Sequence, residues 1–236
     1  MRPDGRAPEA LRPIAIEAGV NRYAEGSALI RWGHTHVLCT ASVLDDQPPH
    51  LKGTDEGWIT AEYGMLPRAT HTRGEREAKR GQKGRTIEIQ RLIGRALRAA
   101  VDREKLGPRT IVLDCDVLQA DGGTRCAAIT GAWVALAEAL DRLYAEGAVS
   151  EHPLRAQVVA VSAGIVAGEP RLDLCYEEDA AAEMDANFVL TPDGGVIEVQ
   201  AASEAEPIAW AMLDRLAELA RRAAPEIAQI QQRARS

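Results

Sequence analysis

Apolar residues recur along the chain with two periods, and segments of each period come in blocks. Alternating or continuous apolar runs, rich in β-branched residues, are typical of strands. Such runs occupy residues 12–17, 27–32, 36–42, 58–63, 110–118, 157–167, 171–176, 187–190 and 196–200. The last two flank the turn sequence Pro192-Asp193-Gly194-Gly195, which predicts a β-hairpin.

Three longer segments have the spacing of helices. Residues 86–101 carry apolar side chains at i, i+3 and i+4, and we expect Thr86 to cap this helix. Residues 125–145 are apolar on nearly every face, which predicts a buried central helix. Residues 208–230 are amphipathic, and Pro225 is expected to kink this helix or to start a new turn. The block order of strands and helices predicts an α+β fold with mixed sheets.

A glycine-containing stretch, Asp121-Gly122-Gly123-Thr124-Arg125, joins the strand at 110–118 to the predicted central helix. Glycines allow a backbone to approach a ligand closely, and a helix N-terminus favours negative charge. Thr124 adds a hydroxyl donor and Arg125 a guanidinium that can bind phosphate oxygens. The stretch therefore indicates a phosphate site, although the spacing is not that of a P-loop. A tight turn with a capping threonine and a surface arginine is the alternative.

Residues 68–85 have the most basic composition in the chain. The cations are Arg68, Arg73, Arg76, Lys79, Arg80, Lys83 and Arg85, and the anions are Glu75 and Glu77. The whole chain carries a net charge of -7, so any nucleic-acid surface has to be local. The segment predicts a loop that meets a polyanion, and a solvated charged loop is the alternative. Its last arginine precedes the expected helix cap and is a further candidate phosphate ligand.

Carboxylates gather after the strand at 171–176. A short connection between Asp179 and Asp185 can bring both groups together, and such oxygen ligands suit Mg²⁺. An acidic surface turn is the alternative. Two further carboxylates, Asp114 and Asp116, share one face of a strand, where we expect them to find ion-pair or capping partners; a contribution to a functional site is the alternative.

Composition predicts the kind of core and the cellular compartment of the protein. Hydrophobic residues make up 46% of the chain but aromatic residues only 4%, which predicts an aliphatic core. The four cysteines form no C-x-x-C pair and are expected to be reduced core residues. No apolar stretch is long enough to span a bilayer, so we expect a soluble, cytoplasmic protein without a membrane partner. The polar residues 1–6 are expected either to be disordered or to pack against another segment.

Four stretches of sequence resemble the ribonuclease PH family of phosphate-dependent exoribonucleases, which trim the 3′ ends of tRNA. The similarity runs nearly from end to end, and only residues 201–208 depart from the family pattern. The four stretches are Met1-Arg2-Pro3-Asp4-Gly5-Arg6, residues 57–68 (GWITAEYGMLPR), residues 84–93 (GRTIEIQRLI) and residues 113–125 (LDCDVLQADGGTR).

The resemblance implies a structure and an assembly. It implies an α+β fold made of two similar βα halves, within a single domain of residues 1–236. It also implies a homohexameric ring built as a trimer of dimers. Arg68, Arg73 and Arg76 match basic positions that the family uses for tRNA contact.

The resemblance also implies a set of active-site residues. Inorganic phosphate, the co-substrate, is expected to be held by Arg85, Gly123, Thr124 and Arg125. Asp179 and Asp185 are expected beside the reacting bond, as ligands of Mg²⁺ and as proton donor, with Arg125 also acting in catalysis.

The motifs and the resemblance together predict a phosphorolytic 3′→5′ exoribonuclease that trims tRNA precursors and other RNA 3′ ends, releasing nucleoside diphosphates. One alternative is a non-catalytic, RNA-binding ring subunit on the same scaffold, which is expected to lack the phosphate ligands or the aspartates. Another is a hydrolytic nuclease or a nucleotidyltransferase that uses its carboxylates to hold two metals and has no need of an anion site.

Overall fold

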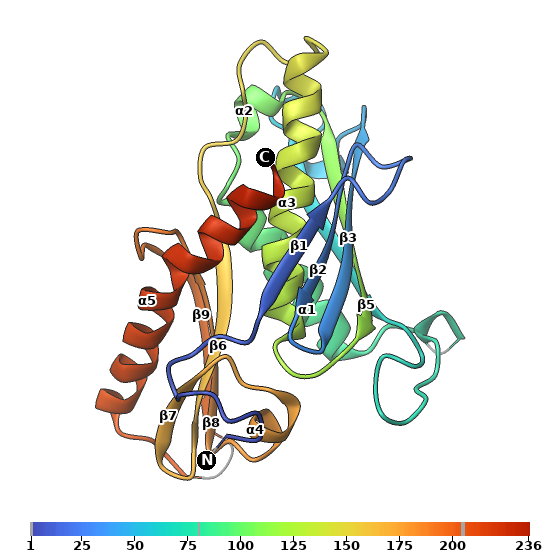
Figure 1. The fold of residues 1–236 in the computed structure, drawn as a ribbon. Coiled ribbons are helices and arrows are strands. Elements are labelled where there is room, and N and C mark those ends of the chain that lie inside the picture. The colour runs from blue at the N-terminus through green and yellow to red at the C-terminus, as the bar shows by residue number, and fades with distance from the viewer. Residues whose placement is uncertain (1, 80, 204–205) are drawn as a thin grey trace.

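A computed structural model describes residues 2–79, 81–203 and 206–236 of the chain, which form two sheets packed against one long helix (Figure 1). The first sheet has the strand order β1-β2-β3-β5-β4. Strands β4 and β5 are parallel, and the other neighbours in this sheet are antiparallel. Its strands are β1 (Ile14–Ala18), β2 (Gly26–Trp32), β3 (Thr35–Leu44), β4 (Trp58–Met65) and β5 (Thr110–Gln119).

The second sheet is antiparallel throughout and has the strand order β7-β6-β8-β9. Its strands are β6 (Val159–Val166), β7 (Glu169–Leu172), β8 (Met184–Leu190) and β9 (Val196–Ser203). The helices are α1 (Gly84–Arg98), α2 (Arg103–Leu106), α3 (Thr124–Ala145), α4 (Tyr176–Ala180) and α5 (Trp210–Ala234), with short 3₁₀ turns at Pro49–Leu51 and Glu77–Lys79. Helices pack against both sheets, and the predicted α+β fold with two βα halves is confirmed.

Helix α3 lies at the centre of the molecule and contacts both sheets (Figure 1). Its small and aliphatic side chains are buried on nearly every face, as the sequence predicts. Glycines allow the close approach to the first sheet. A Cβ atom at Gly26 would lie 2.0 Å from the Ala135 carbonyl oxygen, and one at Gly131 would lie 2.9 Å from Ile30 Cγ2. The middle of α3 is therefore held closely against the first sheet.

Four local predictions differ from the structure. Thr86 is not the cap of α1, since the helix begins at Gly84 and the Thr86 hydroxyl donates a hydrogen bond of 2.7 Å to Glu77. The strand expected at 171–176 ends at Leu172, because Tyr176 starts α4. Helix α5 continues through Pro225, so of the two outcomes expected there the start of a new turn is wrong.

The fourth difference concerns Asp114 and Asp116. Within the described residues neither carboxylate has an ion-pair or capping partner, contrary to expectation. Burial, and then the neighbouring carboxylates Glu62 and Asp116, raise the pKa of Asp114. The outer face of β5 is open enough to leave both groups partly in contact with water.

The N-terminal segment packs against the second sheet rather than lying free. Arg2 is 4% exposed, and its guanidinium donates to both carboxylate oxygens of Glu178 at 2.8 Å. It also donates to the carbonyl oxygens of Leu172 and Asp173. These bonds tie the start of the chain to residues more than 160 positions away. In the part of the chain that is described, no helix is long and apolar enough to cross a membrane.

Candidate active site

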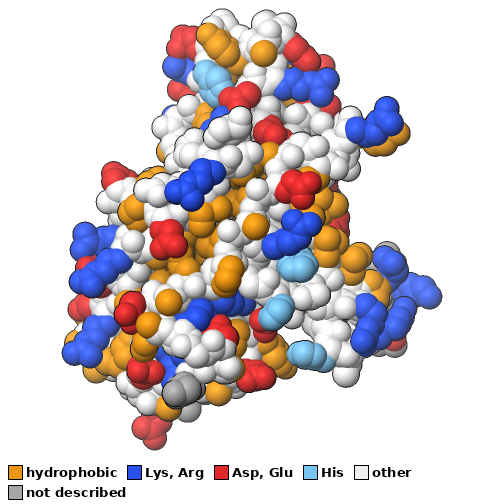
Figure 2. Space-filling model, viewed as in Figure 1, with side chains coloured by type: hydrophobic (Ala, Val, Ile, Leu, Met, Phe, Trp, Pro, Cys, Tyr) orange, Lys and Arg blue, Asp and Glu red, His pale blue; other side chains and the backbone are white. Residues whose placement is uncertain are grey.

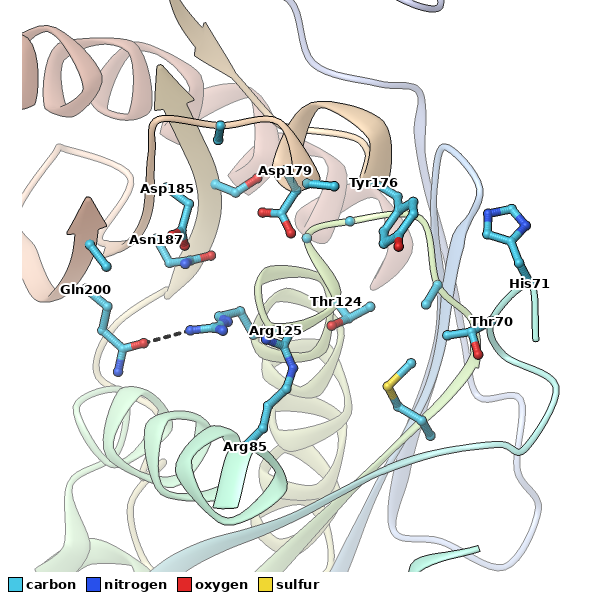
Figure 3. Close-up of a pocket in the computed structure, with 18 of the residues that line it drawn as sticks. Thr70, His71, Arg85, Thr124, Arg125, Tyr176, Asp179, Asp185, Asn187 and Gln200 are labelled. Atoms are coloured by element: carbon cyan, nitrogen blue, oxygen red, sulfur yellow. Dashed lines mark hydrogen bonds between the residues drawn. The ribbon is translucent and has the colours of Figure 1, made fainter. Parts of the chain in front are cut away.

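A pocket of about 940 Å³ opens at the N-terminus of α3, between α1, α4 and strands β8 and β9 (Figure 3). It is bordered by elements of both sheets, so neither half of the chain builds it alone. Six positions proposed from the sequence line it, namely Arg85, Gly123, Thr124, Arg125, Asp179 and Asp185.

The turn before α3 has the backbone geometry of an anion site. Gly122 and Gly123 have φ values of 74° and 65°, in the left-handed region that favours glycine. A Cβ atom at Gly122 would lie 2.5 Å from the Leu174 carbonyl oxygen, so this position also needs glycine for space. Gly123 is the N-cap of α3 and makes no side-chain cap, which leaves the first N–H groups of the helix to face the pocket.

Thr124 is oriented by a buried tyrosine. The Tyr63 hydroxyl donates to Thr124 Oγ1 at 2.9 Å. Burial raises the pKa of Tyr63, against the opposing effects of the Thr124 bond and of Arg85 and Arg125. Because Tyr63 stays protonated and occupies an acceptor position of Thr124, the Thr124 proton is free to be donated to an anion in the pocket.

Two arginines point into the pocket from the first turns of two helices (Figure 3). Arg125 is the second residue of α3, and its Nη1 donates to Gln200 Oε1 at 3.0 Å and lies 3.6 Å from Glu88 Oε1. Arg85 is the second residue of α1 and is exposed. Both guanidinium groups therefore add to the positive ends of helix dipoles, which favours an anion with several negative oxygens.

The two aspartates come from the second sheet and its short helix. Asp179 lies in α4 and is exposed, whereas Asp185 lies in β8 and is half-buried. In Figure 3 both carboxylates point toward the side of the pocket that holds Thr124 and Arg125. The described residues contain no cluster of three or more His, Cys, Asp or Glu suited to a metal ion. Two carboxylates fit Mg²⁺, which keeps several waters and takes other ligands from substrate phosphates.

Comparison with known proteins identifies the family. Residues 10–140 match the model of the 3′ exoribonuclease family, domain 1, and residues 156–223 match that of domain 2. The chain belongs to the 3′ exoribonuclease family. The ribonuclease PH of Maricaulis maris (strain MCS10) is 59% identical to it over 232 residues, which covers 98% of each chain. The predicted membership and the predicted phosphate-dependent exoribonuclease activity are confirmed.

Solved structures share the fold of this exoribonuclease. An exosome of Archaeoglobus fulgidus, with RNA bound to the active site, has a chain that superposes with a TM-score of 0.83 at 24% identity, over 97% of this chain and 91% of that one. An archaeal exosome core superposes with a TM-score of 0.73 at 22% identity, over 99% and 90%.

The turn before α3, residues 121–123, is called the anion turn. It is held in place by residues that sequence patterns did not single out. The Arg12 guanidinium bonds to the carboxylate of Asp173, at 2.7 Å from Nη2, and also to the Asp121 carbonyl oxygen. Thr35 donates to the Gly122 carbonyl oxygen at 2.6 Å. Arg12 is 4% exposed and Asp173 1% exposed, so this brace between the two sheets is buried. Partners 161 positions apart leave no local signal in the sequence.

Two amide side chains also complete the pocket. Asn187 and Gln200 are paired across β8 and β9, on the face that carries Asp185. The Cys126 thiol lies 3.3 Å from Asn187 Oδ1, and burial raises its pKa to about 12, so it remains a donor. The alternation of Asp185 and Asn187 in the predicted hairpin was the signal available for Asn187.

The basic loop of the exoribonuclease lines one side of the pocket through Thr70, His71 and Thr72, but its three proposed tRNA contacts lie outside the pocket. Arg68, Arg73 and Arg76 are all exposed, and none of the three lines the pocket. Arg68 donates to the His71 carbonyl oxygen at 2.8 Å, which shapes the start of the loop. Lys and Arg side chains gather on this loop in Figure 2, whereas Arg80 falls outside the described residues.

Proposed function

We propose that this exoribonuclease shortens the 3′ ends of tRNA precursors, using inorganic phosphate to release nucleoside diphosphates. The observation that carries the proposal is the convergence of an anion-binding turn, two arginines and two carboxylates on one pocket. A hydrolase has no need of the anion turn, and a non-catalytic ring subunit has no need of both sets of charged groups.

In this proposal the phosphate co-substrate binds at the start of α3. The backbone N–H groups after Gly123, the Thr124 hydroxyl and the guanidinium groups of Arg85 and Arg125 supply its hydrogen bonds. Arg125 exchanges its bond to Gln200 for bonds to phosphate. The main task of the site is to align two anions and offset their repulsion, because phosphoryl transfer needs little covalent chemistry from the protein.

The bond that breaks joins the last phosphorus of the RNA to the 3′ oxygen of the preceding nucleotide. A phosphate oxygen attacks that phosphorus, and the terminal nucleotide leaves as a nucleoside diphosphate. The departing 3′ oxygen takes up a proton, for which Asp185 is our first choice of donor and Asp179 the second. Asp179 and Asp185 would hold Mg²⁺, which supplies positive charge to the phosphate oxygens when bound.

The proposal also covers RNA binding, assembly and cellular compartment. Arg68, Arg73 and Arg76 hold the RNA backbone, since they are exposed cations on a loop beside the pocket. The active particle is a homohexamer built as a trimer of dimers, and its mass in solution would be six times the 25.5 kDa of the chain. The enzyme acts in the cytoplasm, a reducing compartment that suits its four free cysteines.

The decisive experiment supplies a tRNA with extra 3′ nucleotides and Mg²⁺, with and without inorganic phosphate, at equal ionic strength. Chromatography of the products should show nucleoside diphosphates, and only when phosphate is present. Nucleoside monophosphates formed without phosphate would identify a hydrolase and contradict the role of the anion turn. RNA that binds but yields no product would identify the non-catalytic ring subunit.

A further inference from the structure

A second cavity joins the active-site pocket at the side chains of Tyr176 and His71. It has a volume of about 780 Å³, and its lining shares Thr70, His71, Ala120 and Tyr176 with the first pocket. The two cavities are therefore neighbours, separated by these shared side chains. Of the residues to which the proposed function gives roles, only Arg68 lines the second cavity, although an RNA chain has to leave the reaction centre through an adjoining space.

Tyr176 is placed where a nucleobase would pass from one cavity to the other. Its side chain is 51% exposed, and its ring lies 5.8 Å from that of His71, tilted by 56°. In Figure 3 the two rings border the same side of the pocket, one from α4 and the other from the basic loop. A large aromatic ring that is open to a polar groove is the usual platform on which proteins stack single-stranded bases.

The backbone of Tyr176 is fixed to the anion turn. Its N–H donates to Asp121 Oδ1 at 3.2 Å, and it begins α4. The absent Cβ of Gly122 leaves just enough room, since a Cβ there would lie 3.0 Å from the Tyr176 nitrogen. The backbone that carries the ring therefore has a set position relative to the proposed phosphate ligands, and a base stacked on the ring would help to fix the RNA backbone at the reaction centre.

The charges of the second cavity indicate stacking rather than electrostatic binding. Asp4 and Arg12 are each held in ion pairs within the fold, and Asp121 lies 3.8 Å from Arg12. The other lining residues with a full charge are Arg68 and Glu177, which have opposite signs. The cavity is therefore not a cationic channel, and affinity there has to come largely from its rings.

We propose that Tyr176, with His71 beside it, is a nucleobase-stacking subsite for the nucleotide on the 5′ side of the bond that breaks. The inference rests on the proposed function, which puts that bond at the first cavity. The departing nucleoside diphosphate stays there with the phosphate ligands, so the shortened RNA extends into the second cavity, past Arg68. Because every base has a π face, the subsite accepts any sequence.

A binding experiment tests the subsite without catalysis. A single-stranded RNA carries the fluorescent base 2-aminopurine at its penultimate position and is mixed with the enzyme in the absence of phosphate. Stacking on Tyr176 should quench the fluorescence, Tyr176→Ala should abolish the quenching, and Tyr176→Phe, which keeps the ring, should restore it. Equal quenching by the wild type and Tyr176→Ala would overturn the proposal. A probe placed well upstream in the RNA is the control for non-specific contact.

Steady-state kinetics provide a second test of the stacking subsite. Tyr176→Ala should lower kcat/KM for phosphorolysis by about 5- to 150-fold, the usual range for loss of one stacked base. An abasic penultimate nucleotide should slow the wild type by a similar factor but slow Tyr176→Ala no further. Tyr144→Ala, which alters an equally exposed tyrosine far along α3, should keep the wild-type rate.

The salt dependence of RNA affinity separates stacking from charge. The slope of RNA affinity against salt concentration should be unchanged by Tyr176→Ala and reduced by the triple change R68A/R73A/R76A. Quenching that depends on Tyr176, in an enzyme that releases no nucleoside diphosphate, would leave the subsite standing and refute the proposed function. Phosphorolysis at the wild-type rate by Tyr176→Ala, with quenching unchanged, would refute the subsite alone.

Discussion

At the scale of single residues, Arg125 carries the clearest prediction. Its side chain is 15% exposed and reaches the pocket from the first turn of α3. Replacing it by alanine removes the proposed charge-assisted contact to phosphate, so we expect kcat/KM to fall by roughly 100-fold or more. Steady-state phosphorolysis at varied phosphate concentration measures this loss.

The matched control for Arg125 lies at the other end of the same helix. Arg142 is exposed and pairs with Glu146 at 2.9 Å, so Arg142→Ala removes a guanidinium from α3 without touching the pocket. It should keep the wild-type rate. An Arg125→Ala enzyme that phosphorolyses RNA as fast as Arg142→Ala would remove Arg125 from the phosphate site.

Sequence patterns located the residues of the site better than the residues that support them. Gly123, Thr124 and Arg125 follow a strand and begin a helix, and local spacing alone reveals that arrangement. The brace formed by Arg12 and Asp173 depends on a contact between segments 161 positions apart. No periodicity records such a contact, so only the folded structure shows why the anion turn keeps its shape.

At the scale of elements, the N-terminal segment is held by a buried carboxylate whose charge depends on pH. Burial alone would raise the pKa of Glu178, but hydrogen bonds from Arg2, from the Cys175 N–H and from Arg171 hold it below its ordinary value. In the unfolded chain Glu178 regains its ordinary pKa, near about 4.3. On acidification the unfolded state therefore takes up a proton first, and the stabilisation by Glu178 is lost as the pH falls below that value.

Chemical denaturation at several pH values tests this linkage. The wild-type free energy of unfolding should include a component that is constant above about pH 5 and declines below about pH 4.3. Glu178→Gln should lack this component and be less stable at neutral pH, by about 3–5 kcal/mol, because Arg2 is left buried without its partner. Glu177→Gln, at an exposed neighbouring position, should follow the wild-type curve. Parallel curves for Glu178→Gln and the wild type would contradict the linkage.

Elements with strong periodicity were predicted close to their true bounds, and short ones were not. Strand β5 is long and alternates between buried and more exposed positions, and helix α3 is long and apolar on nearly every face, so their patterns are unambiguous. Helix α4 covers only Tyr176–Ala180, too few residues for a helical period to appear. The α1 cap at Lys83 uses no side chain, which explains why the capping threonine predicted at Thr86 was the wrong choice.

At the scale of the whole molecule, the order of the strands exceeds what sequence patterns can give. Strand β5 lies between β3 and β4 in the first sheet, although β4 follows β3 in the chain. Helix α3 was predicted to be buried, and burial on every face requires a layer on each side. Contacts of α3 with β2, β3 and β6 show that the two sheets supply these layers together. We therefore propose that residues 1–236 form a single folding unit.

Thr130, a buried residue of α3 next to β6, offers a way to test whether the chain is a single folding unit. The hydroxyl of Thr130, which is 0% exposed, accepts a hydrogen bond of 3.2 Å from the Ala160 N–H. Thr130→Val keeps the shape of the side chain but leaves that buried donor without a partner, at a cost of about 1–3 kcal/mol. If both sheets unfold together, this cost falls equally on amides of β3 and of β6. Native-state hydrogen exchange should then show one common decrease in protection for both strands, whereas a decrease confined to β6 would mean that the halves open separately.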